Sequence, residues 1–222
     1  MVRIMRFLPC PAAVLAVCLA SVLQAGAQTR YSAQPAGTSV KIDGTSSMHD
    51  WQMEGSTIGG YIEFGPGVSL DKTQTTPVGM QGDKVAAKVR AIIPVSTIHS
   101  KADHLPGTMD DLMQQTMKAD DFRTIEFTLT EMTFKGPHAA GQPFEFDTKG
   151  ELVIAGKTNK VNFPVSIEPL DGGKIKVIGT APVKMTDFGV TPPAPNFGLG
   201  MMKCGDAVTI KFDWTLKAKE KK

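Results

Sequence analysis

Two-residue alternation of apolar and polar side chains is the feature that most constrains the fold of this chain. The clearest run lies near the C-terminus, where Val208, Ile210, Phe212, Trp214 and Leu216 alternate with polar or charged residues. This period places alternate side chains on opposite faces of an extended strand, so one face is apolar. Similar runs cover residues 85–93, 125–129 and 161–167, and weaker strand candidates cover residues 40–42, 51–53, 58–64, 144–154, 174–179 and 182–185.

Turn-forming residues separate these runs, and no long helical pattern lies between them. Asp171-Gly172 between two of the runs is a typical hairpin signal. Strands joined by short turns pair antiparallel. Pro164 lies inside one run, where it favours a sheet edge or a bulge because proline has no N–H for the ladder. We therefore predict an all-β fold with a mainly antiparallel sheet.

One segment departs from the alternation. Met109, Leu112, Met113 and Met117 recur at a spacing that places them on one face of a helix. We predict one short amphipathic helix over residues 108–117, lying against the β structure. A methionine stripe commonly fills a core, but methionine side chains also adapt to a flexible apolar ligand.

The first 27 residues have the layout of a secretory signal peptide. Two arginines precede an apolar stretch that leads to Ala25-Gly26-Ala27, a cleavage signal of small residues. A retained N-terminal membrane anchor is the alternative, but the apolar stretch is short for a span and contains two prolines. We expect cleavage and export to the periplasm, with secretion from the cell as a second possibility. Residues 28–38 are polar and are predicted to form a linker.

Cleavage would change both the charge and the cysteine content. Residues 1–27 contain two of the 24 basic residues and no acidic residue, so 22 of each sign would remain. Basic and acidic residues are interspersed, which gives no support for nucleic-acid binding. Cys204 would be the only cysteine, so an internal disulfide is excluded, and we expect a small buried apolar side chain.

Five segments of the chain together form a distinctive pattern of order and spacing. They are residues 40–51, which end in His49-Asp50-Trp51, residues 89–98, three blocks within residues 109–127, residues 150–161, and residues 186–193 followed by 205–210. In these segments the chain resembles the YceI-like family of lipid- and polyisoprenoid-binding proteins. The resemblance implies an antiparallel eight-stranded lipocalin-like barrel over residues 39–217. Residues 218–222 are rich in lysine and are predicted to form a basic tail.

The same resemblance implies that the barrel interior holds an isoprenoid or another long-chain lipid. We expect an exported carrier that does no chemistry on its ligand and needs no cofactor. Its other contacts would be transient ones with a membrane or an envelope protein. The inward faces of the predicted strands and helix supply the candidate lining residues: Val89, Ile93, Leu112, Met113, Phe127, Phe163, Val165, Ile210 and Phe212.

Two other functions remain open at this point. The first is a filled-core interaction module of the envelope, because alternation cannot separate a filled barrel from a hollow one. The second is a hydrolase or metal enzyme built on His49, Asp50 and a nearby serine, or on the loop that carries His99 and His104. Adjacent strand residues face opposite sides, so His49 and Asp50 are poorly placed to act on one substrate. The two loop histidines also lack the i, i+4 spacing of a helical metal site.

Overall fold

The strands predicted from alternation are present in the computed structural model, which describes residues 28–101, 106–194 and 202–219. The predicted signal peptide therefore lies outside the described residues. All strand pairs are antiparallel. The elements are β1 (Thr29–Ala33), β2 (Ser39–Ser46), β3 (Trp51–Gly55), β4 (Gly59–Phe64), β5 (Ala87–Pro94), the 3-10 turn η1 (Val95–Thr97), β6 (Ile98–Ser100), α1 (Pro106–Thr116), β7 (Thr124–Phe134), β8 (Phe144–Ile154), β9 (Lys157–Leu170), β10 (Lys174–Lys184), the 3-10 turn η2 (Thr186–Phe188) and β11 (Cys204–Ala218).

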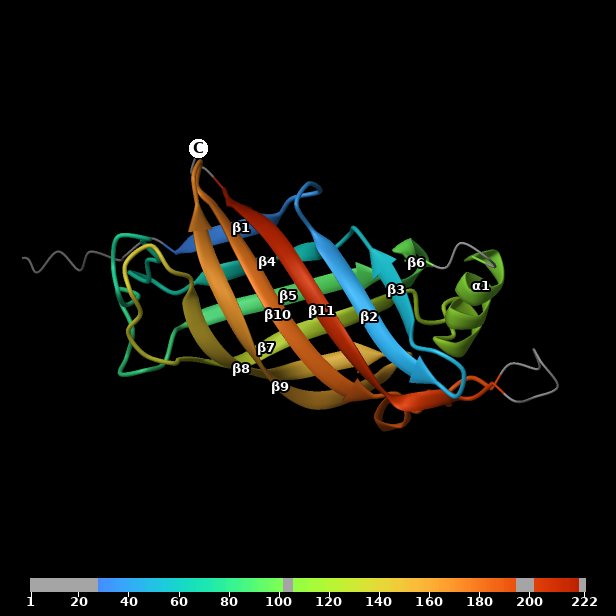
Figure 1. Cartoon of the computed structure of the whole chain (residues 1–222). Helices are drawn as coiled ribbons and strands as arrows, with labels where there is room; N and C mark the ends of the chain where they lie inside the picture. The colour runs from blue at the N-terminus through green and yellow to red at the C-terminus, as the bar shows by residue number, and fades with distance from the viewer. Residues whose placement is uncertain (1–27, 102–105, 195–201, 220–222) are drawn as a thin grey trace, which may run out of the picture.

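These strands close into a barrel of eight antiparallel courses, where a course is one strand or two consecutive strands in line (Figure 1). β1 and β2 form one course because both pair with β11. β3 and β4 form the next course, and β5 and β6 continue each other across η1. The strands from β7 to β11 supply the other five courses, and the pairing of β1 with β11 closes the ring. The predicted eight-stranded antiparallel barrel is confirmed.

The prediction of a linker over residues 28–38 is wrong for its first half, which forms β1. Tyr31 is paired with Ile62 of β4 on one side and with Ala218 of β11 on the other. Its ring also packs edge-on against Phe64, with 5.9 Å between the ring centroids. A five-residue strand with one large apolar side chain is too short to show alternation. Backbone hydrogen bonds to two neighbouring strands hold it in the barrel wall.

Pro164 lies at a local sheet edge, as predicted. It is paired with Asp147 of β8, whereas the ladder between β9 and β10 ends at Val165 and Gly179. The turn η2 lies beside the first half of β9, where Asn159 Nδ2 donates to the carbonyl oxygen of Asp187 at 2.6 Å. The two runs predicted at 174–179 and 182–185 form one strand, β10.

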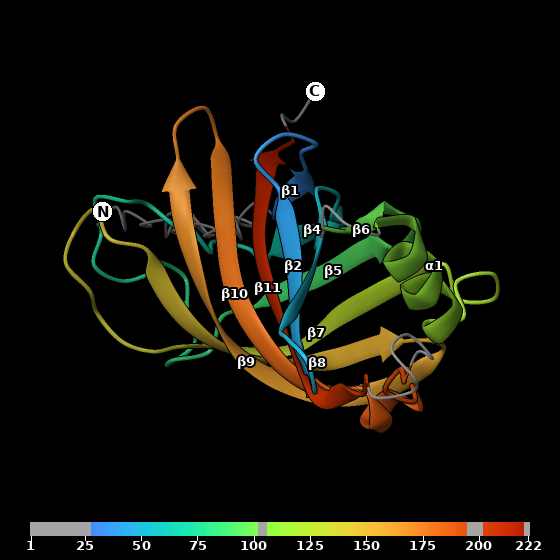
Figure 2. The same cartoon turned by 45° about the vertical axis from the view of Figure 1, so that its right-hand side comes forward.

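The two ends of the barrel differ, because long loops lie at one end and α1 lies at the other (Figures 1 and 2). At the end that carries the long loops, which we call the packed end, phenylalanine rings fill the interior. Phe134 lies 5.7 Å from Phe146 and 6.4 Å from Phe144, measured between ring centroids. The two ends of the described chain meet here as well, because the N–H of Lys219 donates to the carbonyl oxygen of Arg30 at 2.9 Å.

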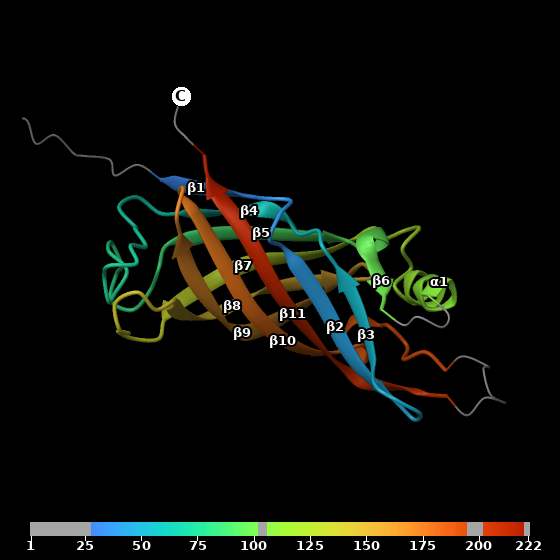
Figure 3. The same cartoon turned by 45° about the horizontal axis from the view of Figure 1, so that its top comes forward.

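The helix α1 lies at the opposite end of the barrel, beside β6 (Figure 3). It begins at Pro106 and ends at Thr116, close to the predicted range of 108–117. We call this end the helix end. Across the described segments, no helix is long and apolar enough to cross a bilayer.

Candidate functional site

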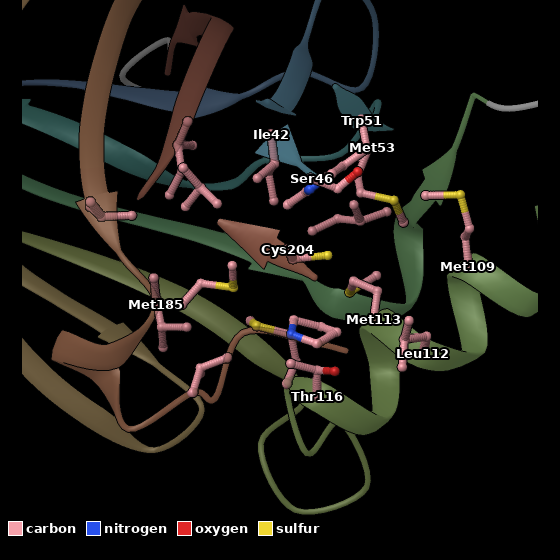
Figure 4. Close-up of a pocket in the computed structure, with 18 of the residues that line it drawn as sticks. Ile42, Ser46, Trp51, Met53, Met109, Leu112, Met113, Thr116, Met185 and Cys204 are labelled. Atoms are coloured by element: carbon pink, nitrogen blue, oxygen red, sulfur yellow. The ribbon is translucent and has the colours of Figure 1, made fainter. Parts of the chain in front are cut away.

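A cavity of about 430 Å³ lies between α1 and the strand ends at the helix end of the barrel (Figure 4). This volume is within the usual range for small-molecule sites. None of the described residues that line this outer cavity carries a carboxylate, ammonium or guanidinium group. The lining comprises Ile42, Ser46, His49, Trp51, Met53, Ile98, Met109, Leu112, Met113, Thr116, Met117, Ile125, Ile154, Val183, Met185, Phe188, Val190, Pro193, Met202, Cys204, Val208 and Ile210.

Methionine is unusually frequent in this lining. The side chains of Met109 and Met113 extend from α1 toward Met53 of β3, Cys204 of β11 and Met185, which follows β10 (Figure 4). Methionine has three rotatable bonds and a polarisable sulfur, so such a wall can adapt to apolar ligands of different shape. Six methionines line the outer cavity: Met53, Met109, Met113, Met117, Met185 and Met202.

A second, inner cavity of about 90 Å³ lies deeper in the barrel. Ile125 and Ile210 line both cavities, so the inner cavity adjoins the outer one. Among the described residues that line it, Thr148 and Trp214 are the two with a polar side-chain group, a hydroxyl and an indole N–H, and the others are aliphatic or aromatic. That hydroxyl donates to the carbonyl oxygen of Phe163 at 2.6 Å, and the Trp214 indole N–H donates to the carbonyl oxygen of Ile58 at 3.0 Å. The inner cavity therefore presents an apolar surface to any occupant.

The nine predicted lining residues all border one of these two cavities. Ile210 borders both, and Leu112 and Met113 border the outer cavity. Contact of these residues with a ligand remains a prediction. The other six border the inner cavity: Val89, Ile93, Phe127, Phe163, Val165 and Phe212.

Most of the outer cavity was missed by reasoning from the sequence. Met53, Met185 and Cys204 lie in weak strand candidates or beside strand ends, where alternation does not show which side chains converge. The recurrence of methionine at positions far apart in the chain was the available signal.

The segment from Ser46 to Trp51 forms the turn between β2 and β3 at the mouth of the outer cavity. The hydroxyl of Ser46 donates to the carbonyl oxygen of His49 at 2.6 Å and accepts from the His49 N–H at 3.1 Å. The indole N–H of Trp51 donates to the carbonyl oxygen of Thr45 at 3.0 Å. These contacts shape the turn and set the Trp51 ring in the cavity wall. They lend no support to the hydrolase alternative, in which a serine hydroxyl would face the His49 imidazole.

The metal alternative also gains no support from the described residues. Nδ1 of His99 lies 3.0 Å from Oδ2 of Asp110. In the described ranges, no group of three or more histidine, cysteine or acidic side chains is placed to hold a metal ion. His104, the other histidine of that hypothesis, lies outside the described residues.

Cys204 lies in the outer cavity wall and is half-buried, whereas we predicted a buried side chain. Burial raises the pKa of its thiol above the ordinary value. The thiol form is therefore favoured at neutral pH, which suits an apolar wall.

A carboxylate fixes the part of the wall that follows β10. The backbone N–H of Thr186 donates to Asp206 at 2.9 Å and its hydroxyl donates at 2.7 Å. Both hydrogen bonds lower the pKa of the Asp206 carboxyl, and the one from the Thr186 backbone N–H has the larger effect. They hold η2 against the start of β11, which places the buried side chains of Phe188 and Val190 in the outer cavity wall.

Comparisons with known proteins agree with this barrel. The family model of the YceI-like domain matches residues 31–216. The structure is similar to that of BcnA from Burkholderia cenocepacia, with 17% identity and a TM-score of 0.58, over 82% of this chain and 98% of the other. It is also similar to a polyisoprenoid binding domain from Saccharophagus degradans implicated in plant cell wall breakdown. That match has 11% identity and a TM-score of 0.59, over 85% of this chain and 98% of the other.

At these identities the structural matches establish the shared fold. A search of curated proteins finds no match to this sequence. The family model, by contrast, extends over nearly all of the barrel, from β1 to the end of β11. The chain therefore belongs to the family of YceI-like domain proteins.

Proposed function

We propose that this protein binds and carries an isoprenoid or another long-chain lipid without changing it chemically. The observation that carries the proposal is the outer cavity, an apolar space of about 430 Å³ that adjoins the apolar inner cavity. The domain family and the polyisoprenoid-binding relative from Saccharophagus degradans support this class of ligand. A cavity of this size also speaks against the filled-core interaction module.

The energetics of apolar burial are sufficient for such a role. Each buried methylene contributes about 0.8 kcal/mol, so ten of them contribute about 8 kcal/mol before other costs. Association costs about 4–15 kcal/mol, so affinity depends on how many methylenes the cavities enclose. Specific polar contacts are not needed to hold the chain.

The charge of the ligand is constrained by the same lining. A charged group buried without a partner is strongly disfavoured. No carboxylate, ammonium or guanidinium group among the described residues lines either cavity, so we propose that only the apolar chain enters. Any charged headgroup would stay at the mouth, beside the turn that carries Ser46 and His49.

The proposal places the carrier outside the cytoplasm, in the periplasm. The support for this is the signal-peptide pattern of residues 1–27. N-terminal sequencing of the protein recovered from a periplasmic fraction would test it. A protein that begins at Gln28 is the expected result, and an intact N-terminus in the cytoplasmic fraction would contradict it.

Native mass spectrometry of the purified protein, before and after organic extraction, tests the binding function. We expect an added mass that extraction removes, and a melting temperature that rises when farnesol or a long-chain fatty acid is added back, because ligands of the native state stabilise it. Met113→Lys, which places a charge in the outer cavity, should abolish both effects. Gln115→Lys on the exposed face of α1 is the matched control and should preserve both.

A wild-type protein without added mass, and without a shift on addition of either lipid, would overturn the binding function. If Met113→Lys and Gln115→Lys lose the added mass and the rise in melting temperature to the same extent, the loss is caused by charge on the helix and not by charge in the cavity.

A further inference from the structure

Aromatic residues and glycines alternate around half of the barrel wall, at the level of the inner cavity. Phe127 is on β7, Gly150 on β8, Phe163 on β9, Gly179 on β10 and Phe212 on β11. The ring centroids of Phe127 and Phe163 are 5.2 Å apart, and those of Phe163 and Phe212 are 6.0 Å apart. β7 and β11 are four places apart in a ring of eight courses, so they lie on opposite sides. We call these three phenylalanines the aromatic collar.

The two glycines make room for the collar. A Cβ atom on Gly150 would overlap the ring of Phe127, and a Cβ atom on Gly179 would overlap the ring of Phe212. Neither glycine has a positive φ, so the backbone does not require glycine at these positions. Each ring thus lies over the neighbouring strand, in space that a methyl group would otherwise occupy, and extends less far into the barrel interior.

The collar lies next to the junction of the two cavities. Ile125 and Ile210 line both of them. Phe127 and Phe212 are the next inward-facing residues on the same two strands, and they line the inner cavity alone. Both rings are only partly buried although strands surround them, as expected for side chains that face a cavity. A chain that enters from the helix end therefore reaches the collar after it has filled the outer cavity.

We propose that the aromatic collar determines the length of the apolar chain that this protein accepts, an inference that rests on the proposed function. The methionine-rich outer cavity takes the first part of any chain. Further methylenes enter the inner cavity, which offers about 90 Å³ and is lined by Phe127, Phe163 and Phe212. Beyond it lies the packed end, where Phe144 and Phe146 are fully buried. Affinity rises with chain length until the inner cavity is filled and then stops rising.

The test is a length series of saturated primary alcohols, from decanol to eicosanol, on the extracted protein. Their binding is measured by displacement of the neutral fluorophore N-phenyl-1-naphthylamine. In the wild type, affinity should rise by at most about fourfold per methylene and then reach a plateau. The chain length at which the plateau begins is the quantity of interest.

Gly179→Ala is the most direct variant, because the three atoms nearest to its new methyl group all belong to the ring of Phe212. The ring must turn away from the strand and into the barrel interior. We expect the plateau to begin at a shorter chain and the affinity for the longest alcohols to fall at least tenfold. Decanol should bind within twofold of its wild-type affinity.

Phe212→Leu tests the opposite change and removes the ring, so its plateau should begin at a longer chain. The double variant Gly179→Ala with Phe212→Leu should behave as Phe212→Leu does, because the methyl group no longer meets a ring. Gly44→Ala is the matched control. It adds a methyl group under the ring of Trp51, which lines the outer cavity. It should therefore change the affinity for alcohols of every chain length by the same factor.

A plateau at the wild-type length in both Gly179→Ala and Phe212→Leu, with binding retained, would overturn the collar and leave the proposed function intact. If Gly179→Ala does not fold, the Phe212→Leu result decides alone. A wild-type protein that binds no alcohol of any length would overturn the proposed function and the collar together.

Discussion

Asp110 of α1 is hydrogen-bonded to His99 of β6, with 3.0 Å between Oδ2 and Nδ1. The other carboxylate oxygen of Asp110 accepts the backbone N–H of Ser100 in the same strand. Met109, the preceding residue of α1, lines the outer cavity. One carboxylate therefore fixes the first turns of the helix to the barrel, and with them the methionine face of the cavity.

Replacement of Asp110 by alanine should speed ligand release. Both hydrogen bonds would be lost, at a cost of about 1 kcal/mol once the exposure of His99 is allowed for, which corresponds to about fivefold faster dissociation. Asp111→Ala is the matched control, because Asp111 is exposed and borders neither cavity. Stopped-flow displacement of a bound fluorescent fatty acid measures the rate. Similar acceleration in both variants would point to helix charge and not to this anchor.

Oxidation of the cavity methionines should weaken lipid binding. Hydrogen peroxide converts a thioether to a sulfoxide and is itself reduced to water, so an apolar side chain becomes polar. A polar group left without a partner under an apolar ligand costs about 1–3 kcal/mol, so affinity should fall by about fivefold to about 150-fold. Binding is measured after peroxide treatment, with peptide mass mapping of the oxidised sites.

The triple variant Met109→Leu, Met113→Leu, Met117→Leu provides the control for oxidation. It keeps the helix face apolar but removes three of the six thioether groups of the lining. Its affinity should be close to that of the wild type before treatment and should fall less after treatment. An equal fall in the two proteins would place the sensitive methionines elsewhere.

The wall of the barrel could be predicted from the sequence because each half-buried strand carries its own alternation. Ile210 and Phe212 face inward in the structure as their pattern indicated. Strand β1 (Thr29–Ala33) was not predicted, because hydrogen bonds to two neighbouring strands hold it in place and its own sequence shows no apolar alternation.

The cavities could not be predicted in the same way. Alternation tells which face of a strand is inward, but not whether the side chains of opposite strands meet. Phe127 and Phe163 are in contact only because the ring of strands brings β7 and β9 together. The outer cavity likewise forms where Met53 of β3 and Met113 of α1 face a common space. Both features depend on the closed barrel and not on any single segment.

Cys204 should report directly on occupancy of the outer cavity. Burial raises the pKa of its thiol, so alkylation by iodoacetamide should be slow at neutral pH and faster as the pH rises. A bound alkyl chain should slow the reaction further because the thiol lines the cavity. Peptide mass mapping separates Cys204 from the two cysteines of residues 1–27, and Cys204→Ser identifies its peptide. Equal rates with and without lipid would contradict this placement.

The two ends of the barrel should differ in their contribution to stability. Phe146 is fully buried at the packed end, so Phe146→Ala should cost about 3–5 kcal/mol of unfolding free energy. Leu112 is partly exposed at the cavity wall, so Leu112→Ala should cost about 1 kcal/mol or less and should lower lipid affinity instead. Urea denaturation of both variants without lipid measures the difference. A larger loss for Leu112→Ala would show that the helix end carries the stability.

The acid response of the barrel wall should depend in part on Glu131. Its carboxylate lies 2.6 Å from Nζ of Lys149 and 2.8 Å from Nζ of Lys84, and these contacts lower its pKa from 4.5 to about 2. In the unfolded chain the carboxyl group titrates near the higher value, so the ionised form is favoured by folding. The stabilisation is present above pH 4.5 and is lost as the pH falls toward about 2.

Thermal unfolding of the wild type and of Glu131→Gln across this pH range measures the contribution. The wild type should melt at a higher temperature near neutral pH, and the difference should disappear as the pH approaches about 2. Because Glu131 and its two lysine partners are exposed, the difference in melting temperature should be small. It should shrink further at about 1 M salt, where the Debye length is about 3 Å. Glu131 borders neither cavity, so lipid affinity should be equal in the two proteins. A difference in melting temperature that stays constant from neutral to acid pH would show that Glu131 acts through packing and not through its charge.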